Sequence, residues 1–130
     1  MVTDDLASMV VSMRPFVPAR EFQASLGFYE ALGFRSDRLG DRIALMRLGD
    51  GRGAFSFLLQ DFYVKEFAEN LMMHLMVEDL DRWWDHIAAL GLDARFAVPA
   101  PRPPRKESWG LRVAYVWDPA GVLWHVASES

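Results

Sequence analysis

The sequence predicts an α+β fold built from two βαβββ modules that are related by an internal duplication. The first observation is an apolar run of strand length, residues 71–77, followed by a helical pattern that ends at Gly91. The second is a copy of this pattern 58 positions upstream, where Ala31-Leu32-Gly33 corresponds to Ala89-Leu90-Gly91. A fixed offset that aligns a strand, a helix and the glycine after the helix indicates a repeated structural unit.

The first module is predicted to span residues 10–60. Its first segment, 10–19, is extended, and Pro15 and Pro18 cannot donate hydrogen bonds to a neighbouring strand. We therefore expect this segment near a sheet edge or a bulge, after a loose leader at residues 1–9. The remaining elements are a helix at 21–32 and strands at 34–39, 42–48 and 54–60, with a glycine-rich turn at 49–53.

A connection at residues 61–70, expected to contain a short helical turn, leads to the second module at 71–128. Asp79 is the N-cap candidate for a helix at 79–90. The remaining elements are strands near 93–97, at 111–117 and at 122–127, with a proline-rich basic loop at 99–106 and a turn at 118–121. Each module would leave one face of its sheet uncovered, and that face requires another module, a partner chain or a ligand.

Composition limits the function classes. A chain of 130 residues is one structural domain by size, or two half-domains that share a core. Without cysteine it has no disulfide, thiolate nucleophile or cysteine ligand for a metal. The net charge of −4 disfavours nucleic-acid binding. No apolar run approaches the length of a membrane span, and the N-terminus is acidic where a secretory signal is basic, so we expect a cytoplasmic protein.

Four segments together resemble a known superfamily, that of glyoxalases, bleomycin resistance proteins and extradiol dioxygenases, which share the vicinal oxygen chelate fold. The segments are Phe-Tyr-Glu-Ala-Leu-Gly-Phe at 28–34, Val-Glu-Asp-Leu-Asp at 77–81, Trp-Gly-Leu-Arg at 109–112 and Asp-Pro-Ala-Gly at 118–121. The last two are similar to the bleomycin-resistance branch. The resemblance implies paired βαβββ modules whose sheets form a concave cleft, usually completed in a homodimer.

Catalytic members of the superfamily bind a divalent metal through side chains on the first and last strand of each module. Aligning helix starts and turns places these positions at Arg14, Phe57, Met72 and His125. Among these only His125 can ligate such an ion. A register shift could substitute Gln60 or His74, but three protein ligands would still be difficult to assemble. We therefore expect no metal, no other cofactor and no catalytic residue.

The same strands predict a ligand pocket. Alternation places His74 between Met72 and Met76 on one face of its strand, opposite the face that the helix covers. Trp109 begins the Trp-Gly-x-Arg motif, and in the resistance branch this region borders the drug groove, so it is a candidate wall of the pocket. An alternative is that the two imidazoles are satisfied by neighbouring groups and have no further role. The predicted ligand-binding residues are Arg14, Phe16, Phe57, Met72, His74, Met76, Trp109 and His125.

The leading interpretation is a binding protein that sequesters an aromatic or cationic, antibiotic-like molecule in a cleft at a homodimer interface. Aromatic and methionine side chains suit such a ligand, and net acidity favours cations. Two alternatives remain open. One is a metal-dependent lyase, isomerase or dioxygenase that uses His74 and His125, and the other is a structural or regulatory dimer without a small ligand.

Overall fold

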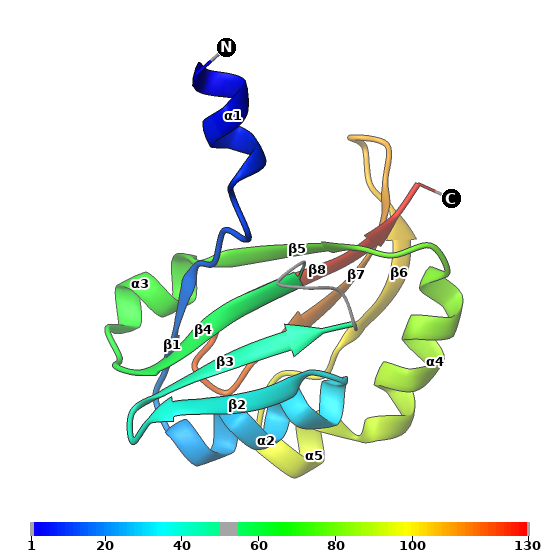
Figure 1. Cartoon of the computed structure of the whole chain (residues 1–130). Helices are drawn as coiled ribbons and strands as arrows, with labels where there is room; N and C mark the ends of the chain where they lie inside the picture. The colour runs from blue at the N-terminus through cyan, green and yellow to red at the C-terminus, as the bar shows by residue number, and fades with distance from the viewer. Residues whose placement is uncertain (1, 50–54, 130) are drawn as a thin grey trace.

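The fold consists of two four-stranded sheets and the helices that cover them, as the computed structural model shows (Figure 1). Residues 2–49 and 55–129 are described. The predicted glycine-rich turn lies largely outside these residues. The sheets have the same strand order along the chain, so the predicted α+β fold of two related modules is confirmed.

Sheet A belongs to the first half of the chain and has the order β1-β4-β3-β2. Its first strand pairs in parallel with β4, and the other pairs are antiparallel. The edge position of β1 fits Pro18, because an edge strand has one row of donors without a neighbour. The strands are β1 (Phe16–Ala19), β2 (Arg35–Gly40), β3 (Ile43–Leu48) and β4 (Phe55–Asp61), and the helix is α2 (Phe22–Leu32).

Sheet B repeats this arrangement in the order β5-β8-β7-β6. Both α2 and α4 contain 11 residues, and their ends lie at the offset that the sequence predicts. Asp79 caps α4 by accepting a hydrogen bond from the backbone N–H of Arg82, as expected. The elements are β5 (Met72–Met76), α4 (Leu80–Leu90), β6 (Arg102–Lys106), β7 (Arg112–Trp117) and β8 (Leu123–Ser128).

Two short helices, α1 and α3, lie outside the repeated pattern of the two modules. The connection between the modules contains α3 (Lys65–Asn70), in agreement with the expected helical turn. The expected loose leader is wrong, because α1 (Val2–Ser8) occupies it; this segment has no glycine or proline, and the Ser8 hydroxyl donates to the carbonyl of Asp5. In Figure 1, α1 stands apart from the sheets. Across the described residues, every helix falls short of the length and hydropathy that spanning a membrane would take.

The second module differs from the prediction between its helix and its last two strands. The strand expected near 93–97 is wrong, because α5 (Leu92–Phe96) lies there; the Phe96 ring packs 5.5 Å from the ring of Phe28. The strand instead forms within the segment predicted as a proline-rich loop. As β6 is the sheet edge and its register shifts between Arg102 and Arg105, the two prolines between them do not interrupt the sheet.

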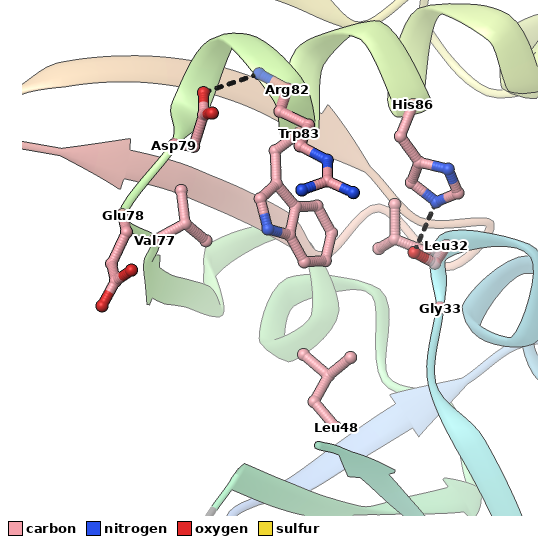
Figure 2. A pocket seen from close by; sticks show the side chains of 9 residues that line it. All are labelled: Leu32, Gly33, Leu48, Val77, Glu78, Asp79, Arg82, Trp83 and His86. Atoms are coloured by element: carbon pink, nitrogen blue, oxygen red, sulfur yellow. Dashed lines mark hydrogen bonds between the residues drawn. The ribbon is translucent and has the colours of Figure 1, made fainter.

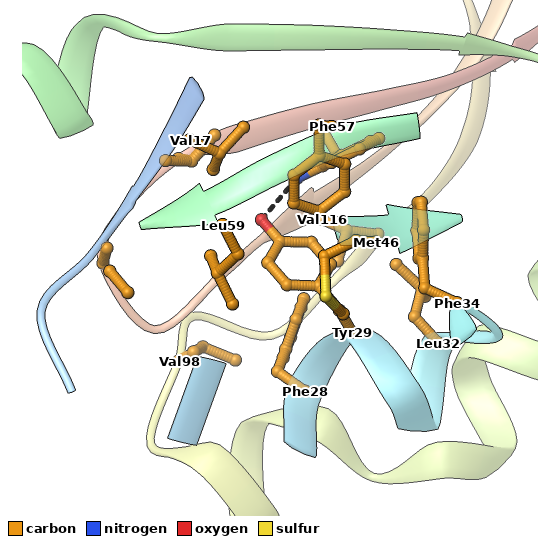
Figure 3. Close-up of a cluster of buried hydrophobic side chains, with 14 of the residues drawn as sticks. Val17, Phe28, Tyr29, Leu32, Phe34, Met46, Phe57, Leu59, Val98 and Val116 are labelled. Carbon is orange, nitrogen blue, oxygen red and sulfur yellow. Dashed lines mark hydrogen bonds between the residues drawn. The ribbon is translucent and has the colours of Figure 1, made fainter. Parts of the chain in front are cut away.

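One hydrophobic core joins the two modules (Figure 3). Tyr29 of α2 lies at its centre, with its ring 4.9 Å from that of Phe57 and 5.6 Å from that of Trp124. Phe57 belongs to sheet A and Trp124 to sheet B, and their rings are 5.6 Å apart. The inner sides of both sheets therefore contact each other within one chain.

A buried hydrogen-bond network fastens the modules at the same place. The Tyr29 hydroxyl donates to Asp118 Oδ2 over 2.5 Å, and the Trp124 indole N–H donates to the Tyr29 hydroxyl over 2.9 Å. Asp118 Oδ1 accepts from the backbone N–H groups of Ala120 and Val122. Burial outweighs these bonds and raises the pKa of Asp118 to about 6. Burial also raises the pKa of Tyr29.

Each sheet has a second side, directed away from this core, which we call its open face. Because the inner sides share a core, the open faces of sheets A and B cannot cover each other within one chain. The open face of sheet A includes Phe16, which pairs with Leu58. The open face of sheet B is formed by Met72, His74, Met76, Arg102, Arg105, Val113, Tyr115, Trp117, Leu123, His125 and Ala127.

Candidate functional site

The open face of sheet B presents a row of four polar side chains. Strand register places Arg102 opposite Tyr115, Tyr115 opposite His125, and His125 opposite His74. Directly paired residues point to the same face, so all four project together from β6, β7, β8 and β5. Three strand spacings make this row about 14 Å long. The sheet thus aligns groups that lie far apart in sequence.

Two imidazoles form the end of the row on β5 and β8. The ring centroids of His74 and His125 are 6.2 Å apart, and the Tyr115 ring lies 5.1 Å from that of His125. Partial burial is the main cause of a lowered pKa at His125, and repulsion from His74 is the second cause. A neutral His125 can donate with one ring nitrogen and accept with the other. The row therefore offers hydrogen bonds and ring faces at one place.

Tyr115 is held in place by a carboxylate from the β6–β7 connection. Its hydroxyl donates to Glu107 Oε2, and Arg105 Nε donates to Oε1 over 3.2 Å. The bond from Tyr115 is the main cause of a lowered pKa at Glu107. Burial is the main cause of a raised pKa at Tyr115. Both oxygens of Glu107 are therefore engaged, and the phenol ring has a fixed orientation.

Apolar side chains surround the row and are open to solvent. Met72 is 63% exposed, Met76 is 46% exposed and Trp109 is 56% exposed. The Trp109 ring lies 6.5 Å from the ring of His125 and nearly perpendicular to it. On the other side of the row, Trp117 lies under the guanidinium of Arg102. A planar aromatic molecule could stack between these rings and displace water from the methionines.

The structure gathers five of the eight predicted ligand-binding residues on or beside this face. They are Met72, His74, Met76, Trp109 and His125. Phe16 lies on the open face of sheet A instead, where it is 51% exposed. Arg14 is exposed in the segment between α1 and β1, outside both sheets.

Phe57 requires a correction. It is 1% exposed and belongs to the shared core, although it also borders a small cavity of about 170 Å³ with His74. In sheet A the counterpart of the His74–His125 pair is the pair formed by Phe16 and Leu58. The alignment by turns was therefore displaced by one residue, and a shift of one residue exchanges the two faces of a strand.

The pairing of β1 with β4 and of β5 with β8 shows whether this chain has the ligands that hold the divalent metal in catalytic members of the superfamily. His74 and His125 supply two nitrogen donors, whereas Phe16 and Leu58 at the corresponding positions supply none. Over the described ranges, no cluster of three histidine, aspartate or glutamate side chains is arranged to hold a metal ion. The donor set of these positions therefore does not fit the metal.

Three residues of the row and its bordering rings, Arg102, Tyr115 and Trp117, were not predicted as site residues. Tyr115 and Trp117 alternate with core residues in their strand, and pairing that strand with the one that carries His125 would have placed them on its face. Arg102 could not be placed, because its segment was predicted as a loop. Placing Arg102 would have required the prediction of a strand that contains Pro103 and Pro104.

A separate groove lies between the two halves of the chain (Figure 2). It has a volume of about 630 Å³ and contains none of the predicted site residues. Two of its polar groups have local partners, since His86 Nε2 lies 2.8 Å from the carbonyl oxygen of Leu32 and Asp79 caps its helix. Its walls are Leu32, Gly33, Leu48, Val77, Glu78, Asp79, Arg82, Trp83 and His86.

Comparison with known proteins agrees with the fold. A bleomycin resistance determinant encoded on transposon Tn5 is 22% identical, with a TM-score of 0.75, over 91% of this chain and 97% of that one. A bleomycin-binding protein from Streptomyces verticillus, solved with copper(II)-bleomycin, is 24% identical, with a TM-score of 0.74, over 93% and 98%. An antibiotic-binding protein from Streptomyces sp. CB03234 is 22% identical, with a TM-score of 0.69, over 93% and 95%.

At these identities the structural matches establish the fold alone, and no curated protein matches the chain. The family model covers far more than half of the sequence, since it matches residues 10–126. This span contains sheet A, all of sheet B except the last two residues of β8, and all four segments that carry the resemblance. The chain belongs to the glyoxalase/bleomycin resistance protein/dioxygenase superfamily.

Proposed function

We propose that this protein is a binding protein that sequesters an aromatic, antibiotic-like small molecule in a cleft at a homodimer interface. The observation that carries the proposal is the row of imidazole and phenol side chains on an exposed sheet face, bordered by Trp109 and two methionines. Residues 10–60 and 71–128 would act as the two modules, joined by 61–70. A cytoplasmic location remains part of the proposal.

The homodimer is supported by the arrangement of the open faces. Phe16 on sheet A and Met72 on sheet B are both more than half exposed, although each is large and apolar. Within one chain these faces cannot close over a ligand, because the sheets contact each other through their inner sides. Sheet A of one protomer facing sheet B of its partner would cover both faces and enclose a cleft.

The ligand class follows from the groups that would line the cleft. Rings of Trp109, Tyr115 and His125 favour a flat aromatic molecule, and flexible methionines adapt to its outline. The net charge of −4 favours cationic forms at long range. Bleomycin-binding and antibiotic-binding proteins among the similar structures support this class. A metal-dependent activity is not favoured, since the aligned positions supply two donors.

Quenching of tryptophan fluorescence by a panel of bleomycin and polycyclic aromatic antibiotics tests the proposal. We expect saturable quenching by at least one compound, and an affinity about tenfold lower in Trp109→Ala, because stacking on that ring is lost. Trp83→Ala is the matched control, since Trp83 lines the separate groove. A flat response to the whole panel, or an equal loss in both variants, would contradict the proposal.

A further inference from the structure

We propose that the ligand of the open face of sheet B carries an acidic group and that Arg102 binds this group at the β6 end of the row. This inference deepens the proposed function and rests on it. Arg102 on β6 extends the site beyond the two imidazoles. Its positive charge favours one class of ligand, an aromatic molecule with a carboxylate or sulfonate. The net charge of −4 describes the whole surface and favours cations at long range, whereas the charges beside the ligand on this face are those of Arg102 and Arg105.

The position of Arg102 is set by the sheet and by an indole ring. Cross-strand pairing with Tyr115 directs its side chain onto the open face. Its guanidinium carbon lies 5.4 Å from the centroid of the Trp117 ring. A cation–π contact of this kind leaves guanidinium N–H groups available for a planar acidic group. The side chain is thus positioned before a ligand arrives.

The positive charges on the open face of sheet B outnumber the carboxylates beside them. Arg102 and Arg105 project from β6, and Glu107 is the carboxylate beside them. Both oxygens of Glu107 are engaged, one by Arg105 and the other by the Tyr115 hydroxyl. Among the described residues, no carboxylate forms an ion pair with Arg102. An incoming acid would therefore meet a cation that has an aromatic contact and forms no ion pair with a carboxylate of the described residues.

The row also fixes where the acid would lie relative to the rings. Arg102 and His125 are separated by two strand spacings, about 10 Å, with the Tyr115 ring between them. Rings that stack near Trp109 and His125 would direct an acidic substituent across Tyr115 toward β6. A guanidinium–acid contact in this position would discriminate between ligands of the same ring shape.

Two fluorescent probes of matched ring structure test the inference. The acidic probe is 8-anilinonaphthalene-1-sulfonate, and the neutral probe is N-phenyl-1-naphthylamine, which lacks the sulfonate. We expect the full chain to bind the acidic probe about tenfold more tightly. Arg102→Gln should remove most of this preference and change the affinity for the neutral probe less than about twofold, because the rings keep their contacts.

Lys106→Gln is the matched control. It removes the same charge from the same strand, but Lys106 pairs with Arg112 on the opposite face. An equal loss in Lys106→Gln, or no loss in Arg102→Gln, would overturn the inference. If both probes bind equally but Trp109→Ala weakens both, the inference fails and the proposed function stands. If neither probe binds and the antibiotic panel gives no quenching, both fail.

Discussion

Replacing Asp118 with alanine should lower the free energy of unfolding by about 3 kcal/mol. The substitution removes the acceptor for the Tyr29 hydroxyl and for the backbone N–H groups of Ala120 and Val122. All three donors are buried, so water cannot replace the lost bonds. Urea denaturation measures the effect, with Asp85→Ala as the control because Asp85 is exposed on its helix. An equal effect of the two substitutions would contradict the proposed role of this network.

The same carboxyl predicts a dependence on pH. Its pKa is raised from 3.8 to about 6, so between these values the folded chain holds the proton more tightly than the unfolded chain. Stability should therefore increase as the pH falls from 7 to 4, relative to Asp118→Asn, which cannot titrate. One proton gives a slope of at most about 1.4 kcal/mol per pH unit. Parallel curves for the two proteins, measured from pH 7 to 4, would show that this carboxyl does not contribute.

Phe57→Ala should lower the free energy of unfolding by about 4 kcal/mol, because it leaves a cavity between the two sheets. The ring contacts Tyr29, Phe34 and Trp124 and is almost completely buried. The loss should affect both modules in one transition, since their core is shared. Thermal and urea denaturation, followed by far-ultraviolet circular dichroism, measure the change.

Phe67→Ala supplies the comparison for this prediction, because Phe67 is 44% exposed on α3. Its substitution should change stability by less than about 1 kcal/mol. Stability of Phe57→Ala close to that of Phe67→Ala would place Phe57 outside the core. Such a result would reopen its assignment to the ligand site.

The duplication could be predicted because helix ends and strand alternation are local properties of the sequence. Glycine at the end of each helix and apolar spacing along it gave α2 and α4 nearly at their observed bounds. The segment after α4 could not be placed by such signals. Leu92–Phe96 is short enough for either a strand or a helix, and its packing on Phe28 decides between them.

The candidate site was predictable in part for a related reason. Alternation along β5 correctly placed His74 on the side of the sheet away from the helix, together with its flanking methionines. Which residues meet across strands depends on register, which the sequence does not specify directly. Phe57 was assigned to the wrong face by a shift of one residue, and Arg102 was missed because its strand contains two prolines.

Methionine methyl resonances provide the most direct test of the open face as the ligand site. Met72 and Met76 lie on that face, whereas Met46 is buried in the core of sheet A. In a protein labelled with 13C at the methionine methyl groups, a panel compound that quenches fluorescence should shift the Met72 and Met76 signals through ring currents. The Met46 signal should stay in place. Shifts confined to Met46, with Met72 and Met76 unchanged at saturation, would contradict a site on this face.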